Sequence, residues 1–141
     1  MDIRQAGIND WKGISSLLDQ LEYPGSEPFL KEKIRQMSED PRERLLVYEK
    51  EGHILGFISL HFIPQIAVEG DFARISYFAV DDTARGGGVG RQMEEYCTRL
   101  AREKGCHLIE VHCHTRRSRA HAFYNRQGYE ELPKYLVKRL K

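Results

Sequence analysis

The sequence predicts a single α/β domain of the mixed α+β kind over residues 1–141, with helices on the faces of one mixed β-sheet. Its length of 141 residues is that of one compact domain. Its 40% hydrophobic residues suffice for a core, and its 30% charged residues are typical of a folded protein's surface rather than of disorder. Runs with strand and helix periodicity follow in the order β-α-α-β-β-β-α-β-α-β, without an internal repeat.

The first half of the chain begins with a short strand at residues 3–6. Asn9 is placed to cap the helix that follows, whose apolar residues recur at helical spacing: Trp11, Ile14, Leu17, Leu18 and Leu21. A second helix carries Leu30, Ile34 and Met37 on one face and stops at Asp40-Pro41. Two β-rich runs, 45–50 and 53–63, are separated by Glu51-Gly52, which predicts a hairpin.

The second half contains a strand at residues 72–80 and a strongly amphipathic helix that ends near Gly105. The apolar stripe of that helix consists of Val89, Met93, Tyr96, Cys97, Leu100 and Ala101. Residues 107–113 read as another strand, residues 118–127 as a helix, and residues 135–140 as a last strand.

Composition excludes several classes of protein. Twenty-two Lys and Arg residues against 21 Asp and Glu give a net charge of +1, so no global charge favours nucleic acid as a partner. No apolar run approaches the ~18 residues of a membrane span, and the first residues do not resemble a signal peptide. The three cysteines, an odd number without a Cys-x-x-Cys pair, favour a reduced, cytoplasmic protein.

The most informative stretch is the glycine-rich segment RGGGVGR at residues 85–91, between a predicted strand and a predicted helix. Glycines let backbone N–H groups approach a ligand closely, and a helix N-terminus attracts anions, so the junction suits a phosphate or pyrophosphate. Arg85 and Arg91 add positive charge at its edges. A flexible glycine turn is the alternative interpretation. The spacing fits neither a Walker loop nor a dinucleotide fingerprint.

Arg85, Gly88 and Gly90 fill the fixed positions of a known pattern. In the GNAT superfamily of acyl-CoA-dependent N-acetyltransferases the pyrophosphate loop reads Gln/Arg-x-x-Gly-x-Gly/Ala. The segment AHAFYNRQGY at residues 120–129 is similar to the family's Ala-x-x-Phe/Leu-Tyr-x-x-x-Gly-Phe/Tyr helix, and Gly56 fits its third strand. The chain resembles this superfamily over nearly its whole length, and looks most like the small bacterial branch that includes aminoalkylphosphonate N-acetyltransferases.

The resemblance implies a GNAT-like central mixed, mostly antiparallel sheet whose central strands, 72–80 and 107–113, splay apart. It also implies acetyl-CoA as co-substrate, with the pantetheine arm in that gap and the thioester carbonyl facing a backbone N–H near Ala79 or Val80. The residues expected to bind it are Phe78, Ala79, Val80, Arg85, Gly86, Gly87, Gly88, Val89, Gly90, Arg91 and Arg117.

The implied reaction moves the acetyl group to a primary amine of a small molecule or peptide by direct attack in a ternary complex. The resemblance is also consistent with assembly of the protein as a homodimer. Tyr124 matches the family tyrosine that donates a proton to the leaving sulfur; alternatively, its ring simply packs beside Phe123.

The general base departs from the family pattern, in which many members carry a glutamate on the strand before the glycine loop. Residues 74–80 contain no carboxylate. Glu110, His112 and His114 share one face of the next strand, and histidine suits proton transfer near neutral pH. His112 as base and attack by free amine, with water carrying the proton away, both remain open.

Two further clusters have ordinary interpretations beside the functional ones. His112 and His114 could chelate a metal from one face, but Cys113 would point away, so no metal is expected. Arg116, Arg117 and Arg119 either meet the 3′-phosphate of coenzyme A or an anionic acceptor, or are merely solvated.

A rival function is a non-catalytic acyl-CoA-binding sensor or partner module on the same fold. A second rival is a metal-binding protein that uses the histidine cluster. For the enzyme, the acceptor site is expected along residues 22–29 and 64–71, whose acidic side chains could attract a cationic amine: Glu22, Glu27, Glu69 and Asp71.

Overall fold

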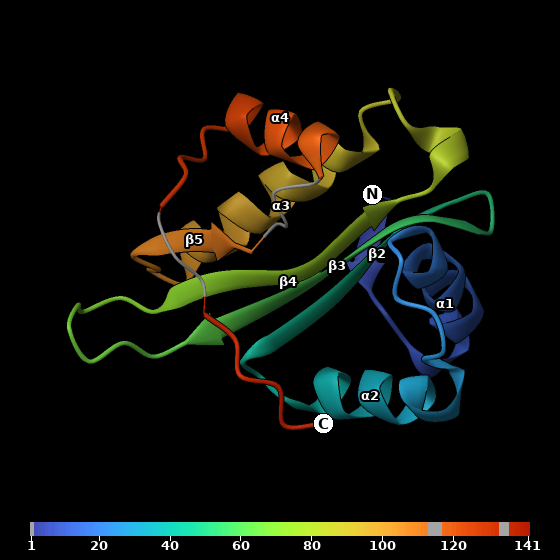
Figure 1. Cartoon of the computed structure of the whole chain (residues 1–141), viewed down its shortest axis with the longest axis horizontal. Helices are drawn as coiled ribbons and strands as arrows, with labels where there is room; N and C mark the ends of the chain where they lie inside the picture. The colour runs from blue at the N-terminus through green and yellow to red at the C-terminus, as the bar shows by residue number, and fades with distance from the viewer. Residues whose placement is uncertain (1, 113–116, 133–135) are drawn as a thin grey trace. The chain divides into compact units, whose positions relative to one another are not determined.

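A computed structural model describes residues 2–112, 117–132 and 136–141, which form two compact units, Met1–Glu110 and Val111–Lys141 (Figure 1). The first unit contains β1 (Ile3–Gln5), η1 (Ile8–Asp10), α1 (Trp11–Gln20), α2 (Glu27–Glu39), β2 (Glu43–Lys50), β3 (His53–Ile63), β4 (Phe72–Val80), η2 (Asp82–Ala84) and α3 (Val89–Glu103). β5 (Leu108–Val111) reaches the second unit, which contains α4 (Ser118–Arg126).

The five strands form one sheet in the order β1-β2-β3-β4-β5, with antiparallel pairing from β1 to β4. β4 and β5 run in the same direction, as two contacts between them show. The His107 N–H donates to the Asp71 carbonyl at 2.8 Å, and three residues further along both strands Arg74 Nε lies 2.5 Å from Glu110 Oε1. The predicted mixed, mostly antiparallel sheet is confirmed, whereas the splaying of β4 from β5 stays a prediction.

Helices cover both faces of the sheet in the Met1–Glu110 unit (Figure 1). α1 and α2 cover the face on which these buried residues gather: Ala6, Ile14, Leu17, Leu18, Leu30, Ile34, Leu45, Val47, Phe57 and Ala79. α3 covers the opposite face, where alternation along the strands places a second buried group: Ile58, Leu60, Phe62, Ile75, Met93 and Cys97.

A β-bulge interrupts β4 in the middle of its pairing with β3. Tyr77 lies opposite Ser59 and Ile75 lies opposite Leu60, so Ser76 is an extra residue without a partner on β3. The bulge places Tyr77 on the α1–α2 face, whereas Ile75 lies on the α3 face. Bulges re-aim side chains and are over-represented beside active sites.

Gly56 on β3 allows α3 to pack closely against the sheet. A Cβ built there would lie 2.8 Å from Met93 Sδ and 3.3 Å from both Val89 Cγ1 and the Ala79 carbonyl oxygen. Gly56→Ala should therefore lower the free energy of unfolding by about 1–3 kcal/mol, the range for overpacking a core. Denaturant unfolding checks this, with Gly7→Ala as the control, because Gly7 has a φ of −117° and a Cβ there would lie 4.0 Å from its nearest neighbour, Asp10 Oδ2. Unchanged stability of Gly56→Ala would contradict the close packing.

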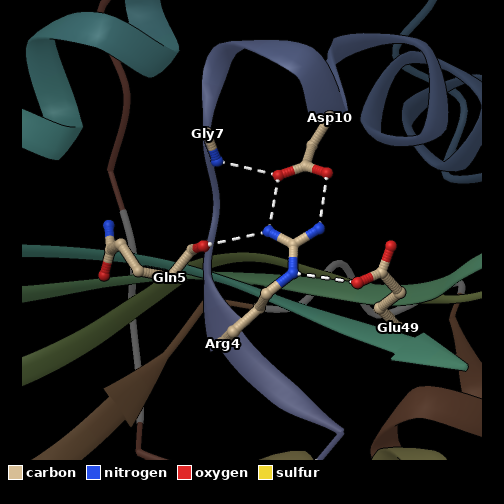
Figure 2. Close-up of polar contacts among 5 residues, drawn as sticks. All are labelled: Arg4, Gln5, Gly7, Asp10 and Glu49. Atoms are coloured by element: carbon tan, nitrogen blue, oxygen red, sulfur yellow. Dashed lines mark hydrogen bonds and ion pairs between the residues drawn. The ribbon is translucent and has the colours of Figure 1, made fainter. Parts of the chain in front are cut away.

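The start of α1 differs from the prediction. η1 precedes α1, and Asn9 lies within η1 instead of capping the helix. Figure 2 shows the contacts that hold this turn: Arg4 donates to both carboxylate oxygens of Asp10, at 2.9 and 2.8 Å, and to Glu49 at 3.0 Å. Asp10 also accepts from the Gly7 N–H at 2.7 Å. The Arg4 guanidinium lowers the pKa of the Asp10 carboxyl, which keeps the pair charged.

The prediction of a last strand at residues 135–140 is wrong for 136–140, which are irregular, and residue 135 lies outside the described residues. A strand needs a neighbour that accepts and donates its ladder hydrogen bonds, and apolar spacing alone cannot indicate whether one is available. Among the helices that the structure describes, none is long and apolar enough to cross a membrane.

Candidate cofactor loop and active site

The glycine-rich segment forms a tight turn between η2 and α3. Gly86 and Gly88 have φ angles of 84° and 85°, in the left-handed region that favours glycine. Gly87 continues the turn, with its N–H bonded to the Ala84 carbonyl at 3.3 Å. A Cβ at Gly86 would meet no atom within 4 Å among the described residues, so the outer side of this turn is open to a ligand.

The N-terminus of α3 is suited to an anion. Gly88 occupies the N-cap position and has no side chain to accept from the N–H groups of the first turn. Those groups belong to Val89, Gly90 and Arg91, at the positive end of a 15-residue helix. The backbone groups expected to bind pyrophosphate therefore lie in one continuous segment, and their role stays a prediction.

Two arginines flank the loop at the surface. Arg85 lies 3.0 Å from Asp82 in an ion pair whose side chains are 45% and 63% exposed. Exposed pairs of this kind are worth ~0–1 kcal/mol, so an incoming phosphate can compete for Arg85. Arg91 is exposed on the first turn of α3.

A contact that sequence reasoning missed holds the start of this loop. The Gln20 side chain, at the end of α1, donates from Nε2 to Asp81 at 3.1 Å and accepts at Oε1 from the Asp82 N–H at 3.0 Å. Asp81 also accepts from the Thr83 hydroxyl and N–H, at 2.6 and 2.9 Å. These donors, led by Thr83, lower the pKa of Asp81, so its carboxylate stays charged and keeps accepting. Gln20 thereby connects α1 to the glycine loop.

Gln20→Leu should weaken acetyl-CoA binding by up to about thirtyfold, because the two hydrogen bonds it removes contribute about 1 kcal/mol each to holding the loop. Calorimetric titration of acetyl-CoA measures this effect. Gln36→Leu, on the exposed face of α2, is the matched control and should leave the affinity unchanged. Equal affinities for both variants would contradict a positioning role for Gln20.

The expected site residues divide between the two units. Phe78, Ala79 and Val80 end β4 and lead through η2 into the glycine loop, so the strand and the loop form one continuous path within Met1–Glu110. Tyr124, His112 and Arg117 belong to Val111–Lys141. Their approach to the cofactor loop stays a prediction.

Tyr124 lies on α4 in a small aromatic group. Its ring makes edge contacts with Phe123 and Tyr129, each with 5.3 Å between ring centroids. The Tyr129 N–H donates to the Tyr124 carbonyl at 3.0 Å, which closes the end of α4. Arg117 is the N-cap residue of α4, and His112 follows the end of β5.

The face of the sheet under α1 and α2 carries polar side chains that the sequence did not indicate as a group. Ser59 Oγ lies 3.3 Å from His61 Nε2, and His61 Nδ1 bonds to Glu43 Oε2. Beside them, Tyr77 contacts Tyr23 edge to face at 5.2 Å between centroids. Tyr23 belongs to the α1–α2 connection, one of the two segments expected to shape the acceptor site.

Only part of the histidine cluster that could chelate a metal lies among the described residues. Cys113, His114 and Arg116 lie outside the described residues. Within the described part of the chain, no group of three or more His, Cys, Asp and Glu side chains is arranged to hold a metal ion.

Comparison with known families decides which family the chain belongs to. Residues 11–129 match the family described as the acetyltransferase (GNAT) family. The chain belongs to this family. Members of the GNAT family are acyl-CoA-dependent N-acetyltransferases that use acetyl-CoA, and the matched residues include the glycine loop at 85–91, whose role in binding the cofactor stays a prediction.

One curated relative is the aminoalkylphosphonate N-acetyltransferase of Salmonella typhimurium strain LT2. It is 29% identical over 92 residues, which are 65% of this chain and 60% of the relative. The match therefore spans less than two thirds of the relative's length.

Solved structures share the GNAT fold. A transcriptional regulator from Bacillus halodurans C-125 has a TM-score of 0.90 at 23% identity, covering 98% of both chains. The aminoglycoside N-acetyltransferase AAC(6')-Iy in complex with CoA has a TM-score of 0.80 at 16% identity, covering 99% of both chains. Identities this low show the fold alone.

Proposed function

We propose that this GNAT protein moves the acetyl group of acetyl-CoA to a primary amine of a small molecule or peptide, by direct attack in a ternary complex. Residues 1–141 act as one N-acetyltransferase domain. The observation that carries the proposal is the continuous path from the end of β4 through the glycine loop, with the left-handed Gly88 at the open N-terminus of α3.

The chain's own groups take the following roles. The N–H groups of residues 86–91 bind the pyrophosphate, and Arg85, Arg91 and Arg117 add charge that complements the phosphates. The backbone of residues 78–80 binds the pantetheine arm, and an N–H near Ala79 or Val80 stabilises the oxyanion that forms on the thioester. The Tyr124 hydroxyl donates its proton to the leaving sulfur.

Direct attack is supported by the state of the described cysteines. Cys97 is buried, and burial raises the pKa of its thiol to about 12, so it stays a neutral thiol. Burial also raises the pKa of Cys106. A covalent acyl-cysteine intermediate needs a thiolate, which neither residue provides at neutral pH. Both thiols are free, which supports the proposed cytoplasmic location.

The acceptor amine must lose a proton before it attacks. His112 and unassisted attack by free amine are the two routes that the sequence leaves open. The acceptor site is proposed along the α1–α2 connection and the β3–β4 connection, near Tyr23 and Tyr77. The curated relative's name makes aminoalkylphosphonates one acceptor class to test.

The deciding experiment is an assay of CoA release from acetyl-CoA with a panel of amines: amino acids, polyamines, aminoglycosides, aminoalkylphosphonates and peptide N-termini. We expect release above the hydrolysis background with at least one class. Acetyl-CoA binding without release for any class would favour the alternative, a non-catalytic acyl-CoA sensor on the same fold.

A further inference from the structure

Ser59, His61 and Glu43 form a hydrogen-bonded chain across β2 and β3, here called the Ser59 relay. Glu43 lies directly opposite His61 in the strand register. An ionised carboxylate only accepts hydrogen bonds, so the proton on Nδ1 of His61 points to Glu43. In the neutral ring, Nε2 then carries a lone pair toward the Ser59 hydroxyl at 3.3 Å. The relay is therefore arranged to draw a proton from Ser59 toward His61.

The relay lies beside the part of β4 that is expected to face the thioester. Ser59 is opposite Tyr77, and the next pair on the same face is Phe57 with Ala79. Residues two apart on a strand are separated by about 6.5–7 Å. Along this face the order is Ala79, Ser59 and then His61, so Ser59 lies on the Ala79 side of the imidazole.

The two ends of the relay differ in their exposure to water. Ser59 is only 4% exposed, whereas the side chains of His61 and Glu43 are 22% and 24% exposed. Tyr77, the cross-strand partner of Ser59, is 40% exposed and contacts Tyr23. A proton that enters at the buried Ser59 can therefore leave to water at the partly exposed His61.

We propose that the Ser59 relay removes the proton of the acceptor's ammonium group, a proposal that rests on the proposed function. Ser59 Oγ takes a proton from R–NH3+ while its own proton passes to His61 Nε2. The ring becomes an imidazolium that the Glu43 carboxylate stabilises, and it returns the proton to water. The amine is left neutral, with its lone pair available to the thioester carbon. β2 and β3 thus provide the base that β4 lacks.

The charged groups that face His61 come from three strands. Glu43 on β2 and Arg74 on β4 both lie opposite His61 in the strand register. Arg74 is itself paired with Glu110 of β5 at 2.5 Å. The buried residues of α1 are apolar: Ile14, Leu17 and Leu18. α3 covers the opposite face of the sheet.

The test measures kcat/KM for CoA release against pH, with two amines of different pKa from the panel. The relay predicts an inflection that stays fixed when the amine changes. His61→Gln should remove the inflection and lower kcat/KM at neutral pH by ~10²-fold, within the range for a general base. Ser59→Ala deletes a single oxygen and should lower it in the same direction. His53→Gln, an exposed histidine on the same strand, should leave the profile unchanged.

Three results would overturn the relay: a His61→Gln profile identical to wild type, an inflection that disappears in His112→Gln instead, or a profile that follows only the amine's own pKa. An NMR measurement of the imidazole nitrogens needs no acceptor. It should show the neutral His61 ring protonated on Nδ1 and bare on Nε2; a neutral ring that carries its proton on Nε2 would exclude the relay. Failure of acetyl-CoA to stabilise the wild-type protein would instead refute the proposed function itself.

Discussion

Gly88→Val should abolish the thermal stabilisation that acetyl-CoA gives to this protein. The wild-type protein should gain about 2.7 kcal/mol at a hundredfold excess of acetyl-CoA over its Kd, because only the folded state binds the ligand. Gly88 has a φ of 85° at the N-cap of α3. A branched side chain there strains the turn and blocks the approach of pyrophosphate to the backbone.

Gly105→Val is the matched control for this experiment. Gly105 lies just beyond the other end of α3, has a φ of 69°, and an added Cβ there would meet no atom of the described residues within 4 Å. The control should lose stability through the same backbone strain but keep the shift with acetyl-CoA. Retention of the shift by Gly88→Val, or stabilisation of the wild type by NADH or ATP instead of acetyl-CoA, would show that the loop assignment is wrong.

Tyr124→Phe should lower the turnover number by ~10²-fold while acetyl-CoA affinity and the fold survive. The change removes the hydroxyl that is proposed to protonate the leaving sulfur and keeps the ring that contacts Phe123 and Tyr129. Steady-state kinetics with the best amine of the panel measures the loss. Tyr129→Phe removes a hydroxyl from the neighbouring ring and should retain turnover. An unchanged turnover number in Tyr124→Phe, with chemistry rate-limiting, would leave that tyrosine a packing role.

Local sequence signals were sufficient for most of the fold. The structure confirms β3 and β4 at the bounds that alternation and flanking turns predict, His53–Ile63 and Phe72–Val80. It also confirms the glycine turn before α3 and the helix at α4, which ends one residue earlier than expected. Each of these depends on periodicity or turn chemistry within a few residues, which one sequence displays directly.

Features that depend on distant partners were not predictable in this way. The Ser76 bulge depends on the register between β3 and β4, and the Gln20 contact joins α1 to a loop about 60 residues later. Asn9 belongs to a residue type that often caps helices, but in this structure it lies inside η1. Arg4 bonds to both Asp10, the last residue of η1, and the distant Glu49, and the sequence does not display these contacts (Figure 2).

The Ser59 relay shows the same limitation at the candidate site. Ser59 and His61 are two residues apart, so their shared face was visible in the alternating pattern. Glu43 joins them only through the hairpin register, which places it opposite His61. Strand register is decided by long-range pairing, and a search for carboxylates on the strand before the glycine loop therefore misses this group.

The most direct test of the account follows the acetyl group itself. Acetyl-CoA with an isotopically labelled acetyl group is incubated with the protein, with and without the best amine of the panel. The masses of the protein chain and of the amine are then measured by mass spectrometry. Direct attack in a ternary complex predicts that the label appears on the amine and never on the chain. Label held covalently by the chain before the amine is added, or no labelled amine at all, would contradict it.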